Sequence, residues 1–167
     1  MRFLAATAAL IFVVLVLGGC DRETVEPLGF REAGTVYSVE GKWMENEIRC
    51  DIYCEKGTLR GICFYEPMQL EGVMITSLSG GGWNVKKGEI SVEMPKNSLE
   101  GILEIGWALA EEPMTVDAVQ YFQKEAQFTL RSGKSGETYV LTLDGEGEPV
   151  FFSGERFSCR ISRVGEL

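Results

Sequence analysis

The sequence predicts a mainly β fold of the α+β class, a curled antiparallel sheet of about ten strands with one central amphipathic helix covering its concave face. Three observations support this prediction. Short runs with alternating apolar and polar residues fill most of the chain. Short turns, many of them containing Gly, separate most of these runs and favour antiparallel hairpins. One central stretch changes to a helical period, and a large sheet needs its apolar face covered.

The N-terminal residues have the organisation of a secretory leader. Arg2 precedes an uncharged apolar run over 3–17, and two glycines follow. Leu17-Gly18-Gly19-Cys20 resembles the bacterial lipobox, and the resemblance implies cleavage between Gly19 and Cys20 and attachment of lipid, including fatty acids such as palmitate, to Cys20. A plain transmembrane anchor is the alternative, because the uncharged run is close to the shortest length that spans a bilayer. Both interpretations place the domain on the extracytoplasmic face of the cell membrane.

The chain divides into three parts on this basis. Residues 1–19 are a lipoprotein signal peptide, 20–34 a lipid-anchored tether, and 35–167 a single β domain. The tether is polar, contains Pro27 and shows no regular spacing of apolar residues. Two acyl chains hold a protein at a membrane almost permanently, so the lipidated Cys20 is the expected membrane contact.

Composition excludes several functions. The chain has 16 Lys and Arg, 25 Asp and Glu, and a formal net charge of −9, which argues against nucleic acid as a partner. It contains no His, so the usual general base, the Ser-His-Asp triad and the commonest zinc ligand are missing. We therefore expect no catalytic residues, no metal and no cofactor.

Four further cysteines follow the lipobox: Cys50, Cys54, Cys63 and Cys159. A two-residue turn at Lys56-Gly57 would place Cys50 opposite Cys63, within reach of a disulfide if the pair geometry is suitable. The alternative is that all four are buried free thiols, which behave as small apolar side chains. A four-Cys zinc site is disfavoured, because the spacing lacks the paired short gaps of structural zinc sites.

Ten segments have the features of strands. The alternation is clearest in 44–54 and in 156–164. A second hairpin turn is expected at Lys87-Gly88. Neither the glycine-rich turn at 79–82 nor the acidic loop at 144–148 has the other residues of a phosphate cradle or a calcium loop. The predicted strands are 35–40, 44–54, 58–65, 70–77, 83–86, 89–94, 126–131, 137–143, 150–153 and 156–164.

The helix is predicted between Pro95 and Pro113. Ser98 is the expected N-cap, and Pro113 ends the helix, because a proline disfavours helical geometry in the residue before it. Residues 115–123 form either a second short helix or an irregular link. Apolar side chains recur at helical spacing on one face: Leu99, Ile102, Leu103, Gly106, Trp107 and Ala110.

This arrangement resembles the LolA/LolB-like half-barrel superfamily of lipoprotein carriers. The resemblance rests on the lipobox, on Phe64-x-x-Pro67-x-x-Leu70-x-Gly72-x-x-Ile75, on the central helix, and on Tyr139-Val140-Leu141-Thr142-Leu143-Asp144 followed by Pro149. It spans about residues 35–164 and implies a half-barrel whose hollow between sheet and helix binds acyl chains.

Two functions follow as hypotheses. In the first, the protein is a non-catalytic binding protein that accepts a lipid or another apolar ligand in the hollow, lined by Trp83, Leu99, Ile102, Leu103 and Trp107. In the second, the core is filled, and a sheet face or edge binds an envelope protein. An enzyme ranks third, because the remaining carboxylate pairs, Glu111 with Glu112 and Glu45 with Glu47, are expected on wet surfaces.

Overall fold

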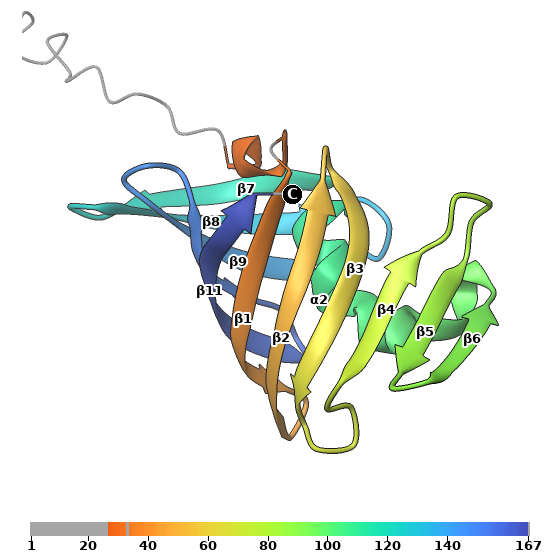
Figure 1. The fold of residues 1–167 in the computed structure, drawn as a ribbon. Helices are drawn as coiled ribbons and strands as arrows, with labels where there is room; N and C mark the ends of the chain where they lie inside the picture. Colours follow the sequence, from red (N-terminus) through yellow and green to blue (C-terminus); the bar gives the residue numbers. More distant parts are fainter. Residues whose placement is uncertain (1–26, 33, 167) are drawn as a thin grey trace, which may run out of the picture.

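The structure is a computed structural model that describes residues 27–32 and 34–166 (Figure 1). The predicted leader, the cleavage site at Gly19 and the lipid site at Cys20 lie outside these residues. Within them, every helix is too short or too polar to cross a bilayer. The predictions about the anchor therefore stay predictions.

One antiparallel sheet of 11 strands forms the domain, in the order β6-β5-β4-β3-β2-β1-β11-β10-β9-β8-β7. The mainly β fold with one central α-helix is confirmed. The first and last of these strands, β1 and β11, pair with each other at the middle of the sheet. The strands are β1 (Thr35–Trp43), β2 (Asn46–Glu55), β3 (Thr58–Glu66), β4 (Val73–Ser77), β5 (Trp83–Lys87), β6 (Ile90–Met94), β7 (Met114–Tyr121), β8 (Glu125–Ser132), β9 (Thr138–Asp144), β10 (Pro149–Ser153) and β11 (Phe157–Glu166).

The α-helix connects the two edges of this sheet. It follows β6 and precedes β7, as 3-10 helix η2 (Lys96–Leu99) and then α2 (Glu100–Ala110). Figure 1 shows the sheet curling so that β7, β8 and β9 cross behind β1 and β11, with α2 in the hollow behind β3. The helix packs on β2 and β3. At Gly106, an added Cβ would meet side-chain atoms of Leu59 and Ile62 at 2.9 Å, so the helix and sheet approach closely there.

The start and the buried face of the helix differ from the prediction. Ser98 is not the N-cap, because the preceding 3-10 turn places Leu99 at that position, with no side-chain capping bond. Burial also extends beyond the predicted face to Ile105, Ala108 and Leu109, each at most 3% exposed. The curled sheet surrounds the helix on more than one side, so a single apolar stripe underestimates its burial.

Residues 115–123 are neither a helix nor an irregular link. Strand β7 occupies most of this stretch and pairs with β8, with a bulge between Val116 and Ala118. As an edge strand it is almost entirely exposed, so its apolar residues show no burial pattern that sequence periodicity can detect. Another small correction concerns the β5–β6 turn, which is Gly88-Glu89 because Lys87 pairs with Ile90.

The predicted pairing of Cys50 with Cys63 is wrong. Glu55 does face Thr58, but a bulge between Tyr53 and Cys54 shifts the register by one residue. Cys50 then lies opposite Phe64, and Cys63 lies opposite Asp51. One residue of shift turns a side chain to the other face of a sheet, and all four described cysteines are free thiols, with Cys63 less buried than the other three.

Part of the predicted tether belongs to the domain. Residues Gly29–Glu32 form the 3-10 helix η1, and Phe30 is buried against Tyr37, with ring centroids 6.0 Å apart. The backbone N–H of Gly57 donates to the Arg31 carbonyl at 2.8 Å, which ties this segment to the β2–β3 turn. The folded unit therefore begins before residue 35.

Candidate functional site

The hollow between sheet and helix is largely filled by side chains. Trp83 is 4% exposed, Leu99 8% and Leu103 0%, and all three belong to the apolar core. Ile102 and Trp107 are half-buried and pack against that core. Of the five residues predicted to line a ligand cavity, Trp107 lines the pocket beside the helix, and the other four are not among the residues that line it. The other four hold the helix on the sheet.

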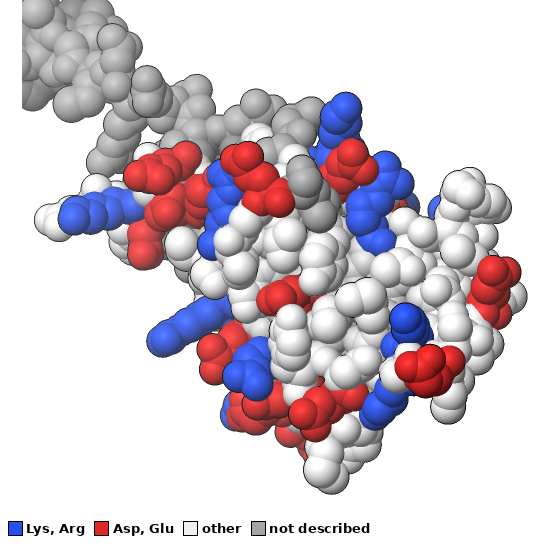
Figure 2. Space-filling model, in the orientation of Figure 1, with Lys and Arg blue, Asp and Glu red and all other residues white. Residues whose placement is uncertain are grey.

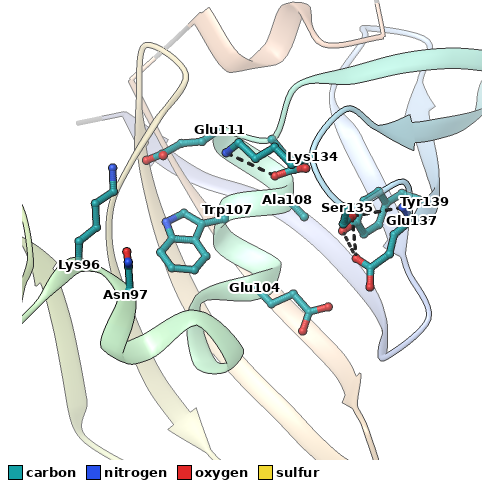
Figure 3. Close-up of a pocket in the computed structure, with 11 residues that line it drawn as sticks. Lys96, Asn97, Glu104, Trp107, Ala108, Glu111, Lys134, Ser135, Glu137 and Tyr139 are labelled. Atoms are coloured by element: carbon teal, nitrogen blue, oxygen red, sulfur yellow. Dashed lines mark hydrogen bonds and ion pairs between the residues drawn. The ribbon is translucent and has the colours of Figure 1, made fainter.

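A pocket of about 340 Å³ remains beside the helix, between α2 and the β8–β9 loop. Figure 3 shows the Trp107 ring in its middle, with Lys96 and Asn97 on one side and Ser135, Glu137 and Tyr139 on the other. Its lining residues are Lys96, Asn97, Glu104, Trp107, Ala108, Glu111, Glu112, Lys134, Ser135, Glu137 and Tyr139.

Aromatic packing positions the floor of the pocket. The Trp107 ring packs against Trp83, with centroids 6.1 Å apart. The indole N–H of Trp83 donates to the Lys96 carbonyl at 3.1 Å. Trp83 therefore fixes both Trp107 and the η2 backbone that carries Lys96, which places two walls of the pocket relative to each other.

The two carboxylates at the end of α2 are structural. Glu111 Oε1 accepts a hydrogen bond from the Leu59 backbone N–H at 2.7 Å, which ties the helix to β3. Glu112 accepts from the Ser132 hydroxyl and lies 3.7 Å from Lys134 Nζ, which ties the helix to the β8–β9 loop. The expectation that these two residues form a wet surface is wrong, because both are half-buried and bind specific partners.

Glu104 forms another side of the pocket. Its carboxylate lies 2.8 Å from Arg156 Nη2, and its side chain is only 12% exposed. Burial raises the pKa of this carboxyl, and the nearby Arg156 offsets part of that increase. The ion pair connects α2 to the β10–β11 loop.

Tyr139 closes the pocket on the β9 side. Its hydroxyl donates to Glu137 Oε2 at 2.8 Å, and the Ser135 hydroxyl donates to the same oxygen at 3.3 Å. Burial and the bond to Glu137 both raise the pKa of Tyr139. Its ring stacks on Phe152, with centroids 5.5 Å apart, so this wall is rigid.

The charged side chains that line the pocket differ in whether they already have a partner in the chain. Each lining carboxylate already accepts a hydrogen bond or ion pair from the chain itself. Lys96 has no ion pair within the residues that the structure describes. Over 27–32 and 34–166, no three His, Cys, Asp or Glu side chains lie close enough together to hold a metal ion. The surface is mixed in charge: on the face shown in Figure 2, Lys and Arg are interspersed with Asp and Glu.

Part of this pocket was visible in the sequence. Glu104, Trp107, Ala108 and Glu111 have the helical spacing i, i+3, i+4 and i+7, so the sequence predicts that they share one face of the helix. The contribution of the β8–β9 loop to the pocket could not be predicted from the sequence, because it depends on how far the sheet curls. Lys134 and Glu137 come from that loop and its border with β9.

Comparison with known proteins supports the fold. No protein-family model and no curated protein matches the sequence. An uncharacterised conserved protein from Thermus thermophilus has a similar structure, at 13% identity and a TM-score of 0.53, over 84% of this chain and 85% of that chain. A LolA superfamily protein from Nitrosomonas europaea is a further structural neighbour, at 8% identity and a TM-score of 0.39, over 82% of this chain and 86% of that chain. The likeness to the Thermus protein is one of fold alone.

Proposed function

We propose that this protein is a non-catalytic, lipid-anchored binding protein on the extracytoplasmic face of the cell membrane. Its binding site is the pocket beside α2, and its ligand is a small amphipathic molecule whose apolar part rests on Trp107. The observation that carries the proposal is the half-buried Trp107 ring in a pocket of about 340 Å³, beside a helix whose Leu99 and Leu103 belong to the core.

The size of the pocket favours a small ligand. Small-molecule sites occupy about 300–1,000 Å³ and combine apolar walls with a few polar groups. Here the apolar surface comes from Trp107, Ala108 and the Tyr139 ring. Because Leu99 and Leu103 are already packed in the core, the ligand occupies the side of the helix rather than the interior of the sheet.

The polar rim favours a ligand with polar or zwitterionic groups at its edge. Lys96 and Asn97 are exposed on one wall, and both have donors to offer. Glu111 and Glu112 also line the pocket, and both carboxylates are already bonded to the chain. A lipid headgroup or a small zwitterion suits this mixture better than a purely apolar molecule does.

A blocking substitution tests the pocket. The test uses residues 21–167, which contain the whole described structure, and identifies by mass spectrometry the organic molecules extracted after native purification. Ser135 is exposed at the pocket wall, so Ser135→Trp fills the pocket from outside the core. We expect a small amphipathic molecule from the parent and from Ser135→Ala, and its loss in Ser135→Trp.

A second pair of variants tests the role of Trp107. Trp107→Ala removes the apolar platform, whereas Phe151→Ala removes a half-buried aromatic side chain that does not line the pocket. We expect only Trp107→Ala to reduce ligand recovery. If the parent yields no ligand, or if all variants yield the same amount, the binding proposal is wrong.

The anchor requires its own test in the producing bacterium. Cys20→Ser should abolish palmitate labelling and leave unprocessed precursor in the cell. Continued labelling of this variant would contradict lipidation at Cys20. A parent that carries no label and keeps residues 1–19 attached would support the transmembrane alternative.

A second candidate function is the binding of a protein through a sheet edge. It is favoured by β7, an edge strand whose residues Val116, Val119 and Tyr121 are 47%, 41% and 40% exposed. Apolar side chains on an exposed edge strand are a typical template for pairing with another chain.

A further inference from the structure

The edge strand β7 carries an apolar row on one face. In the register with β8, Met114, Val116, Val119 and Tyr121 lie opposite Ser132, Leu130, Phe128 and Ala126. Those four β8 residues are buried, so the row on β7 faces the concave side of the sheet. It extends the core surface to the edge, where the described chain supplies no further strand.

The bulge in β7 makes this row symmetric. Val116 and Val119 are three residues apart, a spacing that in a regular strand would put them on opposite faces. The extra residue Asp117 brings them to the same face. When the bulged residue Asp117 is left out of the count, the strand is symmetric about Ala118. The residues then form pairs at equal distances on its two sides: Val116 with Val119, Thr115 with Gln120, and Met114 with Tyr121.

Charge does not oppose pairing at this edge. Asp117 is the only charged residue of β7, and Arg131 of the same chain binds its carboxylate, with an Nε–Oδ2 distance of 2.8 Å. Natural edge strands are commonly protected by charged side chains or by being very short. At the other edge, β6 has five residues, one of which is Glu93, whereas β7 has eight.

We infer that two copies of this chain pair antiparallel through β7, with a two-fold axis at Ala118. Ala118 of one copy lies opposite Ala118 of the other, and Val116 lies opposite Val119. Backbone N–H and C=O groups along the outer sides of the two β7 strands then form a ladder around Ala118, and both apolar rows join on one face. This inference uses a different surface from the ligand pocket and does not depend on it.

Sedimentation velocity of residues 21–167 across micromolar concentrations tests the pairing. We expect the parent to form a reversible dimer. Ala118 is exposed, so its substitution does not disturb the monomer core. Ala118→Lys places two like charges directly opposite each other at the axis, which is destabilising only in this symmetric arrangement. Ala118→Glu does the same with the opposite charge.

The expected result is specific to the axis position. Each variant alone should dimerise at least tenfold more weakly than the parent, while an equimolar mixture of Ala118→Lys and Ala118→Glu should recover a 1:1 heterodimer. The matched control is Val92→Lys on the β6 edge, where the side chain is 52% exposed, and this variant should dimerise like the parent.

Three results would overturn the inference. The parent is monomeric at every concentration; or the Ala118 variants dimerise like the parent; or Val92→Lys, rather than the Ala118 variants, abolishes the dimer. Unchanged far-UV circular dichroism of the variants shows that each monomer remains folded.

Discussion

Arg31 binds Ala108 across 77 residues of sequence: its Nη2 donates to the Ala108 backbone carbonyl at 2.6 Å. The same guanidinium donates to the carbonyls of Leu109 at 2.7 Å and Glu112 at 2.8 Å. The last carbonyls of a helix have no partner within it, and a cation is favourable at that end. Arg31 therefore caps α2 from a segment that precedes the first strand. Burial lowers its pKa to about 10, which leaves it charged at neutral pH.

Removal of this cap should destabilise the domain. Arg31→Ala leaves three carbonyls without their charged donor, and we expect a loss of about 3 kcal/mol in the free energy of unfolding. Arg31→Lys should recover only part of the loss, because one ammonium cannot reproduce the planar fork of a guanidinium. Urea denaturation of residues 21–167 measures both changes.

The control for this prediction is Arg60→Ala. Arg60 pairs with Glu55 at 2.8 Å on the surface, where the two side chains are 50% and 45% exposed. Exposed ion pairs contribute at most about 1 kcal/mol. Equal losses for Arg31→Ala and Arg60→Ala would show that Arg31 contributes charge rather than a cap.

The role of Arg31 also shows where sequence reasoning reached its limit. The strands with alternating side chains were predictable, because one face of each packs and the other is wet. The segment around Arg31 has no period and looks like a linker. Its three bonds form only when the helix end comes within reach, which depends on the curl of the sheet. Bulges also limited the prediction from sequence, since the bulge beside Cys54 changed which residues of β2 and β3 face each other.

Two glycines of α2 should respond in opposite directions to alanine. At Gly106, an added Cβ would lie 2.9 Å from side-chain atoms of Leu59 and Ile62, so Gly106→Ala overpacks the contact and should cost about 1–3 kcal/mol. At Gly101, nothing lies within 4 Å of the added Cβ, and Gly101→Ala should stabilise by about 0.5–1 kcal/mol through helix propensity. Urea denaturation of the two variants and the parent measures both shifts. A stabilised Gly106→Ala would show that Leu59 and Ile62 move aside without cost.

The candidate site was only partly predictable for a related reason. Trp107 lines the pocket beside α2, whereas Trp83, Leu99 and Leu103, which were expected to line the same hollow, lie in the core. Periodicity identifies which residues share a helix face. It does not tell how much of that face the sheet covers, and the polar walls from Lys134 and Glu137 depend on that coverage.

The four thiols of the domain should differ in reactivity. Burial raises the pKa of Cys54 to about 12 and that of Cys159 to about 11, and it also raises the pKa of Cys50. A raised thiol pKa means less of the reactive thiolate at a given pH. Iodoacetamide at mildly alkaline pH should therefore modify Cys63 first, because it lies on the other face of the sheet and is less buried.

Mass spectrometry of peptides from residues 21–167 identifies the modified thiol. In denaturant, all four cysteines should react at similar rates, which is the control for intrinsic reactivity. Rapid native modification of Cys54 would contradict its burial beneath the β2–β3 turn. Resistance of Cys63 in the native chain but not in denaturant would show that its face is covered in solution.

The stability of the domain should depend on the protonation of Glu104. Burial raises the folded-state pKa of this carboxyl above its ordinary value of 4.5, because desolvation outweighs the attraction of Arg156. Between the two pKa values the folded state keeps a proton that the unfolded state has lost. The contribution of Glu104 to the free energy of unfolding therefore falls as pH rises from about 4.5 through the folded-state pKa. Glu104→Gln removes this titration.

Urea denaturation of the parent and of Glu104→Gln at a series of pH values measures the effect. The difference in unfolding free energy, parent minus variant, should decrease as pH rises through this window and then stay constant. Glu45→Gln in the exposed β1–β2 turn is the control for the loss of one negative charge. A difference that increases with pH would mean that the ion pair with Arg156 dominates over burial, because only a lowered folded-state pKa produces that sign. The geometry argues for the decrease, since the Glu104 side chain is 12% exposed while that of Arg156 is 45% exposed and remains hydrated.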